Sequence, residues 1–141
     1  LVSYMRDNGP PPKRILKSES KDGGFTWSMV KDGKLPNPGA GTDAVTLANG
    51  HWAIVYNDTE RGRHSLAVSI SDDGGETWKW TKHLELDERA EKATSSHYPA
   101  IIQGKDEMLH VVYSLHHKDR DGGPHKTIKY AKFPESWITE N

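Results

Sequence analysis

A small set of side chains in this chain is chemically suited to binding or transforming a polar ligand: Tyr98, His97, Asp43, Arg6, Arg61 and Arg63. Tyr98 carries a phenolic hydroxyl, although tyrosine is also common in strands for structural reasons. His97 can orient Tyr98, contact a substrate or be a simple polar neighbour. Arginine guanidinium groups match a carboxylate with two parallel hydrogen bonds, but loop arginines are also often only solvated. Asp43 follows a Gly-rich loop, where it can contact a ligand or cap the turn.

The histidines suggest a metal site at first sight, since three of them surround two aspartates: His116, His117 and His125 around Asp119 and Asp121. Their spacing is not that of a zinc site, and the chain has no cysteine that could supply a thiolate. We therefore expect no metal and no cofactor. The charged run 85–92 is interpreted as a solvated connector.

The composition indicates short strands joined by tight turns. The 141 residues include 13 glycines, eight prolines and five tryptophans, and only 33% of the residues are hydrophobic. The net charge is −1, so nothing indicates nucleic acid or an anionic membrane as a partner. No apolar run approaches the roughly 20 residues that a membrane-spanning helix needs. One modest all-β domain is expected.

An internal repeat organises the elements that must position these side chains. The motif S-x-D-x-G-x-T-W occurs at residues 20–27 and again at residues 71–78, and its tryptophans are 51 positions apart. The aspartates can accept backbone hydrogen bonds across a tight turn, and the glycines can adopt positive φ. We assign these ten residues a structural role: Ser20, Asp22, Gly24, Thr26, Trp27, Ser71, Asp73, Gly75, Thr77 and Trp78.

The flanking segments repeat as well. Residues 43–56 match residues 100–113, each with an apolar strand that ends at Tyr56 or Tyr113. A unit of four short strands in roughly 50 residues is typical of a propeller blade. A β-sandwich gives similar strand spacing but has no reason to repeat its turn chemistry. We expect three blades, at residues 1–32, 43–83 and 97–139, the last ending in a degenerate turn at residues 134–137.

This strand content corresponds to about two and a half to three blades, whereas a propeller closes with typically about four to eight. An open arc leaves apolar blade faces bare to water. We therefore expect the chain to be part of a longer protein, and two copies of the chain as given to pair into a six-blade-like ring.

The paired motifs are Asp boxes, and the chain resembles the BNR-repeat, sialidase-like (neuraminidase-like) family over nearly its whole length. Segments 35–43, 56–63 and 97–103 look characteristic of that group. The resemblance implies a six-bladed propeller, three arginines that grip a sugar carboxylate, a tyrosine nucleophile paired with a glutamate, and an aspartate acid/base. A neutral tyrosine attacks an anionic sugar with less repulsion than a carboxylate would.

Carried over position by position, the resemblance makes Tyr98 the nucleophile. It places Arg61 or Arg63 at the third arginine and Arg6 at the second, with Asp43 and His97 as further substrate contacts. The first arginine, the aspartate and the glutamate would precede Leu1. Proline follows Tyr98 where sialidases commonly have serine, and Pro99 is expected to hold Tyr98 extended.

The predicted function is that of part of a sialidase-like glycoside hydrolase acting on glycans, inactive as this chain alone. The alternatives are a non-catalytic glycan-binding propeller, another glycosidase or a polysaccharide lyase on the same scaffold, and a structural interaction propeller. The resemblance favours an extracellular or periplasmic location and a glycan as partner.

Overall fold

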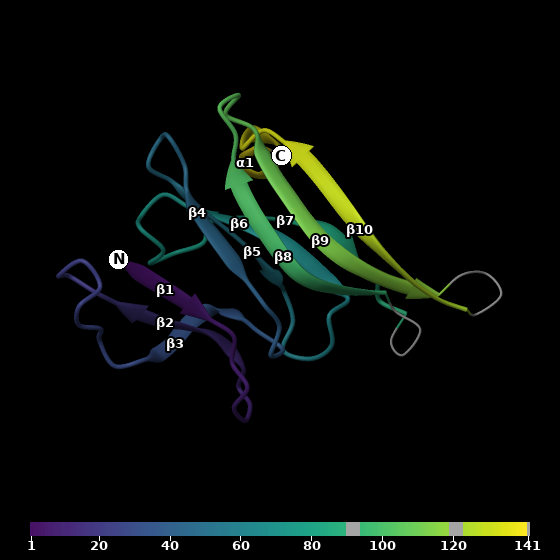
Figure 1. Cartoon of the computed structure of the whole chain (residues 1–141), viewed down its shortest axis with the longest axis horizontal. Helices are drawn as coiled ribbons and strands as arrows, with labels where there is room; N and C mark the ends of the chain where they lie inside the picture. The colour runs from purple at the N-terminus through teal and green to yellow at the C-terminus, as the bar shows by residue number, and fades with distance from the viewer. Residues whose placement is uncertain (90–93, 119–122, 141) are drawn as a thin grey trace.

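The computed structural model describes residues 1–89, 94–118 and 123–140. Within these ranges the chain forms ten strands and one short helix (Figure 1). The strands lie in three antiparallel sheets that follow one another in chain order. The all-β class expected from the composition and the repeats is confirmed.

Each sheet is a meander of strands that are consecutive in the sequence. The first sheet contains β1 (Val2–Met5), β2 (Arg14–Glu19) and β3 (Lys31–Pro36). The second contains β4 (Asp43–Thr46), β5 (Trp52–Asn57), β6 (Ser65–Ser71) and β7 (Trp80–Leu86). The third contains β8 (Ser95–Gln103), β9 (Leu109–Lys118) and β10 (Pro124–Phe133). The helix α1 spans Ser136–Thr139.

Strand register repeats from sheet to sheet, as the sequence repeat requires. Val2 pairs with Glu19 in the first sheet, and the residues 51 positions later, Ala53 and Ile70, pair in the second. The first sheet therefore corresponds to the last three strands of the second. The third sheet corresponds to the first three strands of the second, and together the sheets form one complete blade between two partial ones.

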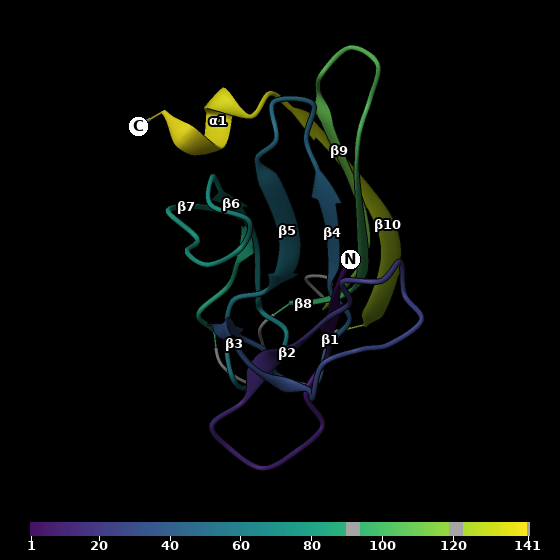
Figure 2. The ribbon, with the colours of Figure 1, turned by 90° about the vertical axis from the view of Figure 1, so that its left-hand side faces the viewer.

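Two apolar cores join the three sheets. The larger lies between the second and third sheets and includes Val55, Leu66, Val68, Val111 and Tyr113. The smaller lies between the first and second sheets, around Ile15, Ile54, Tyr56 and Ala67. Because neighbouring sheets cover it on both faces, every residue of β6 is buried. In Figure 1 the second sheet lies between the other two, and Figure 2 shows the molecule from the side of the first sheet.

Both Asp boxes form the same hydrogen-bonded corner between the third and fourth strand positions of a blade. In the second box, Asp73 accepts hydrogen bonds from the Thr77 backbone N–H (2.8 Å), the Thr77 hydroxyl (2.6 Å) and the Ser71 hydroxyl (2.8 Å). Asp22 accepts the same three bonds in the first box. These bonds to the ionised form hold the pKa of both aspartates well below the usual range.

The segment after β10 differs from the degenerate turn that the sequence indicates. Residues 136–139 form one helical turn, α1, which packs against β6 and β7 of the second sheet. Trp137 lies against Phe133, with ring centroids 4.8 Å apart, and the Lys82 ammonium lies 5.3 Å from the Trp137 ring. Aligned on Trp137, the serine, aspartate and glycine positions of the box hold Tyr130, Lys132 and Pro134, so this segment cannot make the corner.

The solvated connector expected at residues 85–92 is wrong for its first two residues, Glu85 and Leu86, which belong to β7. The Glu85 side chain accepts a 2.5 Å hydrogen bond from the Tyr113 hydroxyl and pairs with Lys129. These contacts tie the second sheet to the third. Residues 90–92 of the run lie outside the described residues.

Candidate functional site

Tyr98 stands out of the first strand of the third sheet on a β-bulge. The register of β8 against β9 shifts between His97 and Ala100, which leaves an extra residue in β8. Tyr98 has φ +48°, and 72% of its surface is exposed. The extended backbone expected from Pro99 is therefore wrong, because the bulge turns Tyr98 into the left-handed region. Bulges often re-aim a side chain beside an active site, and a bulky residue with positive φ is uncommon.

The Asp43 side chain forms a hydrogen bond to the backbone of β8 just after the bulge. Its Oδ2 accepts a 2.9 Å hydrogen bond from the Ile101 N–H, and its Oδ1 accepts one of 3.0 Å from the Ala44 N–H. The glycine-rich loop before Asp43 approaches from the other side, where a Cβ built on Gly41 would lie 3.9 Å from the Tyr98 Cα. The first strands of two neighbouring blades thus meet at Tyr98.

His97 connects Tyr98 to Arg63. The Arg63 Nη1 donates a 2.7 Å hydrogen bond to the His97 Nδ1, and its Nη2 donates one of 3.3 Å to the Gly39 carbonyl. The His97 Nε2 lies 2.9 Å from the Ser95 Oγ. The His97 and Tyr98 ring centroids are 6.3 Å apart. Arg63, His97 and Tyr98 therefore form one group, which we call the Arg63 site.

Basic side chains surround His97. The His116 ring stacks on the His97 ring with centroids 4.1 Å apart and planes 26° apart. Burial is the largest cause that lowers the pKa of His97 from 6.5 to about 4, and electrostatic interactions with His116, Arg63 and Lys126 lower it further. His97 is therefore neutral at physiological pH.

The loop from Asn57 to Arg63 is tied to the start of β8 by backbone and side-chain bonds. The Ser96 N–H donates to the Arg63 carbonyl (2.7 Å), and the Asn57 amide donates to the Ser96 carbonyl (3.2 Å). Asn57 and Ser96 are fully buried, and their Oδ1 and Oγ atoms have no partner among the described residues. These bonds fix the backbone from which Arg63 reaches His97.

The other two predicted arginines do not join this group. Arg6 directly follows β1 in the first sheet, and Arg61 lies at the exposed tip of the loop between β5 and β6. Both are exposed, and no hydrogen bond or ion pair found in the described ranges links either side chain to Tyr98, His97 or Arg63. Of the three arginines, only Arg63 forms a hydrogen bond to His97, the neighbour of Tyr98, within the described residues.

Sequence reasoning missed His116 as a member of the site. It was considered only as a metal ligand, whereas in β9 it lies opposite Ser95 and beside His97. Asp119 and Asp121 lie outside the described residues. Among residues 1–89, 94–118 and 123–140, no group of three histidine, aspartate or glutamate side chains could hold a metal ion. In the same ranges no helix is long and apolar enough to span a membrane.

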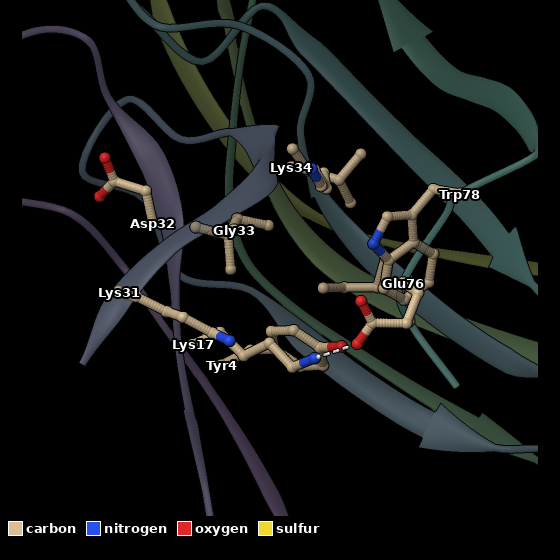
Figure 3. Close-up of a pocket in the computed structure, with 12 residues that line it drawn as sticks. Tyr4, Lys17, Lys31, Asp32, Gly33, Lys34, Glu76 and Trp78 are labelled. Atoms are coloured by element: carbon tan, nitrogen blue, oxygen red, sulfur yellow. Dashed lines mark hydrogen bonds and ion pairs between the residues drawn. The ribbon is translucent and has the colours of Figure 1, made fainter. Parts of the chain in front are cut away.

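A separate cleft of about 270 Å³ lies between the first and second sheets (Figure 3). Tyr4 and Trp78 line it, and the Lys17 ammonium there pairs with Glu19 (2.8 Å) and Glu76 (3.3 Å). The pair with Glu76 links the first sheet to the second, whereas Glu19 lies in β2 together with Lys17. None of the residues predicted to bind substrate lines this cleft.

Comparison with known proteins identifies similar domains and structures. A family model described as a BNR repeat-like domain matches residues 1–111. NanB sialidase from Streptococcus pneumoniae is 17% identical with a TM-score of 0.72, over 97% of this chain and 22% of that chain. The intramolecular trans-sialidase from Ruminococcus gnavus is 16% identical with a TM-score of 0.71, over 99% of this chain and 33% of that chain. A search of curated proteins returns no significant match.

At these identities the structural likeness establishes the fold. The three sheets are blades of a sialidase-like β-propeller, as the repeats predict. The chain spans between 22% and 33% of the length of these solved structures.

Proposed function

The chain belongs to the BNR repeat-like domain family, as its paired Asp boxes predict, and we propose that its Arg63 site binds the acidic sugar of a glycan. The observation that carries the proposal is the bulge at Tyr98, which leaves a phenol exposed next to His97, the residue to which the Arg63 guanidinium donates a hydrogen bond. Tyr98 is 72% exposed. The Arg63 Nη1 lies 2.7 Å from the Nδ1 of His97, the residue that precedes Tyr98. A guanidinium that is held in place can bind a sugar carboxylate with two parallel hydrogen bonds, and an exposed aromatic ring beside it offers a surface for the sugar ring.

Charge supports an anionic ligand at this site. The electrostatic influences on the His97 pKa come from Arg63, His116 and Lys126, which are all basic. An anion entering here meets the positive charges of Arg63 and Lys126, and a guanidinium can bind a carboxylate with two hydrogen bonds. In the sialidase-like interpretation the ligand is sialic acid, Arg63 binds its carboxylate and the Tyr98 hydroxyl faces its anomeric carbon.

Glycan binding without turnover is the second candidate, and the state of Asp43 favours it for this chain alone. Its carboxylate accepts hydrogen bonds from the Ile101 and Ala44 backbone N–H groups. Both carboxylate oxygens are therefore occupied in holding the backbone of β4 and β8. On either candidate we expect the chain by itself to bind an acidic sugar and not to hydrolyse a sialoside.

Isothermal titration of the chain with N-acetylneuraminic acid, and with galactose as the neutral control, tests the proposal. We expect measurable affinity for the acidic sugar only. Arg63→Gln should weaken it at least about tenfold, which corresponds to about 1.4 kcal/mol. Lys79→Gln removes one positive charge near the second Asp box, where Lys79 pairs with Asp72, and should leave affinity unchanged. Equal affinity for both sugars, or equal loss in both variants, would contradict the proposal.

Tyr98→Phe separates the two candidates in a longer protein that also supplies the acid/base. A nucleophilic role predicts loss of sialoside hydrolysis with retained binding. A binding role predicts that the substitution changes affinity little and that neither protein turns over substrate.

A further inference from the structure

Two arginines of this chain, Arg14 and Arg63, each donate to one backbone carbonyl and to one side chain, but the two side chains differ in charge. The Arg14 Nη1 donates to the Lys13 carbonyl (2.9 Å) and pairs with the Glu60 carboxylate. Arg63 also donates to a backbone carbonyl, that of Gly39, but its second acceptor is the His97 Nδ1. Glu60 neutralises Arg14, whereas an imidazole that accepts through a lone pair carries no charge.

The hydrogen bonds of His97 define its protonation state. A guanidinium can only donate, so the His97 Nδ1 must be the acceptor and cannot carry a proton. In the neutral ring the proton then lies on Nε2, which donates to the Ser95 Oγ at 2.9 Å. Both ring nitrogens therefore have a partner in a single tautomer. The pKa of about 4 keeps that tautomer neutral at physiological pH.

The orientation of the His97 ring is fixed as well as its protonation state. His116 stacks on it at a centroid distance of 4.1 Å, and Ser95 fixes the Nε2 edge. The Arg63 backbone is held in turn by the hydrogen bond from Ser96. Rotation of the imidazole would break the bond to Ser95 and the bond to Arg63 together.

We propose that His97 is a positioning residue that orients the Arg63 guanidinium through a neutral acceptor and so leaves its full positive charge for an anionic ligand. The inference rests on the proposed function, since it assigns to Arg63 the carboxylate of the sugar. His97 itself acts through Arg63 and needs no contact with the substrate.

Two substitutions at one position separate orientation from charge. His97→Gln offers a neutral carbonyl oxygen to Arg63, whereas His97→Glu offers a carboxylate that neutralises it. We expect His97→Gln to retain affinity for N-acetylneuraminic acid within about threefold and His97→Glu to weaken it on the order of tenfold or more. Thermal unfolding of both variants checks that each is folded. Equal affinity in the two folded variants, or stronger binding by His97→Glu, would overturn the proposal.

Nuclear magnetic resonance of the wild-type chain tests the positioning role without any sugar. Long-range ¹H–¹⁵N correlation spectra at pH 7 should show the His97 Nδ1 unprotonated and the Nε2 protonated. The Arg63 Nη protons should exchange more slowly with water than those of the exposed Arg61. A protonated Nδ1 refutes the positioning role even if the sugar binds.

The opposite combination of results distinguishes the positioning role of His97 from the proposed binding of an acidic sugar. If the expected tautomer and slow exchange are found but no acidic sugar binds the wild type, the positioning of Arg63 stands and the proposed function fails. Titration with acetate, as a carboxylate probe, should then still perturb the Arg63 Nε resonance in the wild type and less so in His97→Glu.

Discussion

Replacing Tyr98 with asparagine should stabilise the chain and abolish ligand binding. Tyr98 has φ +48°, and the left-handed region costs a non-glycine residue roughly 1–2 kcal/mol. Asparagine enters this region more readily than tyrosine does. Because the tyrosine side chain is 72% exposed, its removal loses little buried area. We expect a net gain of about 0.5–1 kcal/mol in the free energy of unfolding.

Urea unfolding measures that gain, which corresponds to a rise of roughly 2–4 °C in Tm for a domain of this size. Glu107→Asn is the matched control, since Glu107 has φ +62° in an exposed turn far from the Arg63 site. It should show a similar gain with unchanged affinity for the acidic sugar. A loss of more than about 1 kcal/mol in Tyr98→Asn would refute the reasoning, because it would mean that ring packing holds the bulge.

Three further predictions concern the blade joint, pH and assembly. A Cβ on Gly75 would overlap the Tyr4 hydroxyl, whereas a Cβ on Gly74 meets open space. Denaturant titrations should therefore show that Gly75→Ala lowers the free energy of unfolding by about 1–3 kcal/mol more than Gly74→Ala does. Equal losses in the two variants would contradict this. The folded pKa of His97 is about 4, below its ordinary 6.5, so its stabilising contribution is present above pH 6.5 and is lost as pH falls towards 4. The urea midpoint of the wild type should fall over this range, and His97→Gln should reduce that fall. The same pH dependence in both proteins would count against the lowered pKa of His97. The third sheet has a free face on which Ile128 is 71% exposed, and two 15.8 kDa chains should pair through it. Light scattering should therefore give the mass of a dimer for the wild type and of a monomer for Ile128→Lys. A monomeric wild type would contradict the pairing.

The repeated part of the fold was predictable because the same chemistry occurs twice. Asp22 and Asp73 each needed a nearby threonine N–H and hydroxyl, and the S-x-D-x-G-x-T-W spacing supplies both. The Asn49-Gly50 turn, with Gly50 at φ +87°, then sets the register of β4 against β5. Local turn chemistry therefore carries most of the fold information.

The Arg63 site was only partly predictable, because its geometry depends on one extra residue in β8. No glycine marks the bulge, and Pro99 indicated an extended backbone instead of the observed positive φ at Tyr98. Once the register is known, His116 falls opposite Ser95 and beside His97. Sequence spacing alone cannot reveal that pairing, because the loop 104–108 and the bulge both alter the register.

The separation of Arg63 from Arg6 and Arg61 was equally hidden in the sequence. All three arginines occur next to expected strand ends, so type and position did not distinguish them. Arg63 differs because the Asn57 and Ser96 bonds fasten the end of its loop to β8. Those bonds join residues more than 30 positions apart, which no local pattern encodes.

The most direct test of the central claim is to map N-acetylneuraminic acid onto the chain by ¹H–¹⁵N spectra during titration. We expect the largest shifts at Tyr98, His97 and the Arg63 side chain, and none around Trp78 in the cleft between the first and second sheets. Saturable shifts confined to that cleft, or no saturable shift at Arg63, would contradict the assignment of the Arg63 site as the place where an acidic sugar binds.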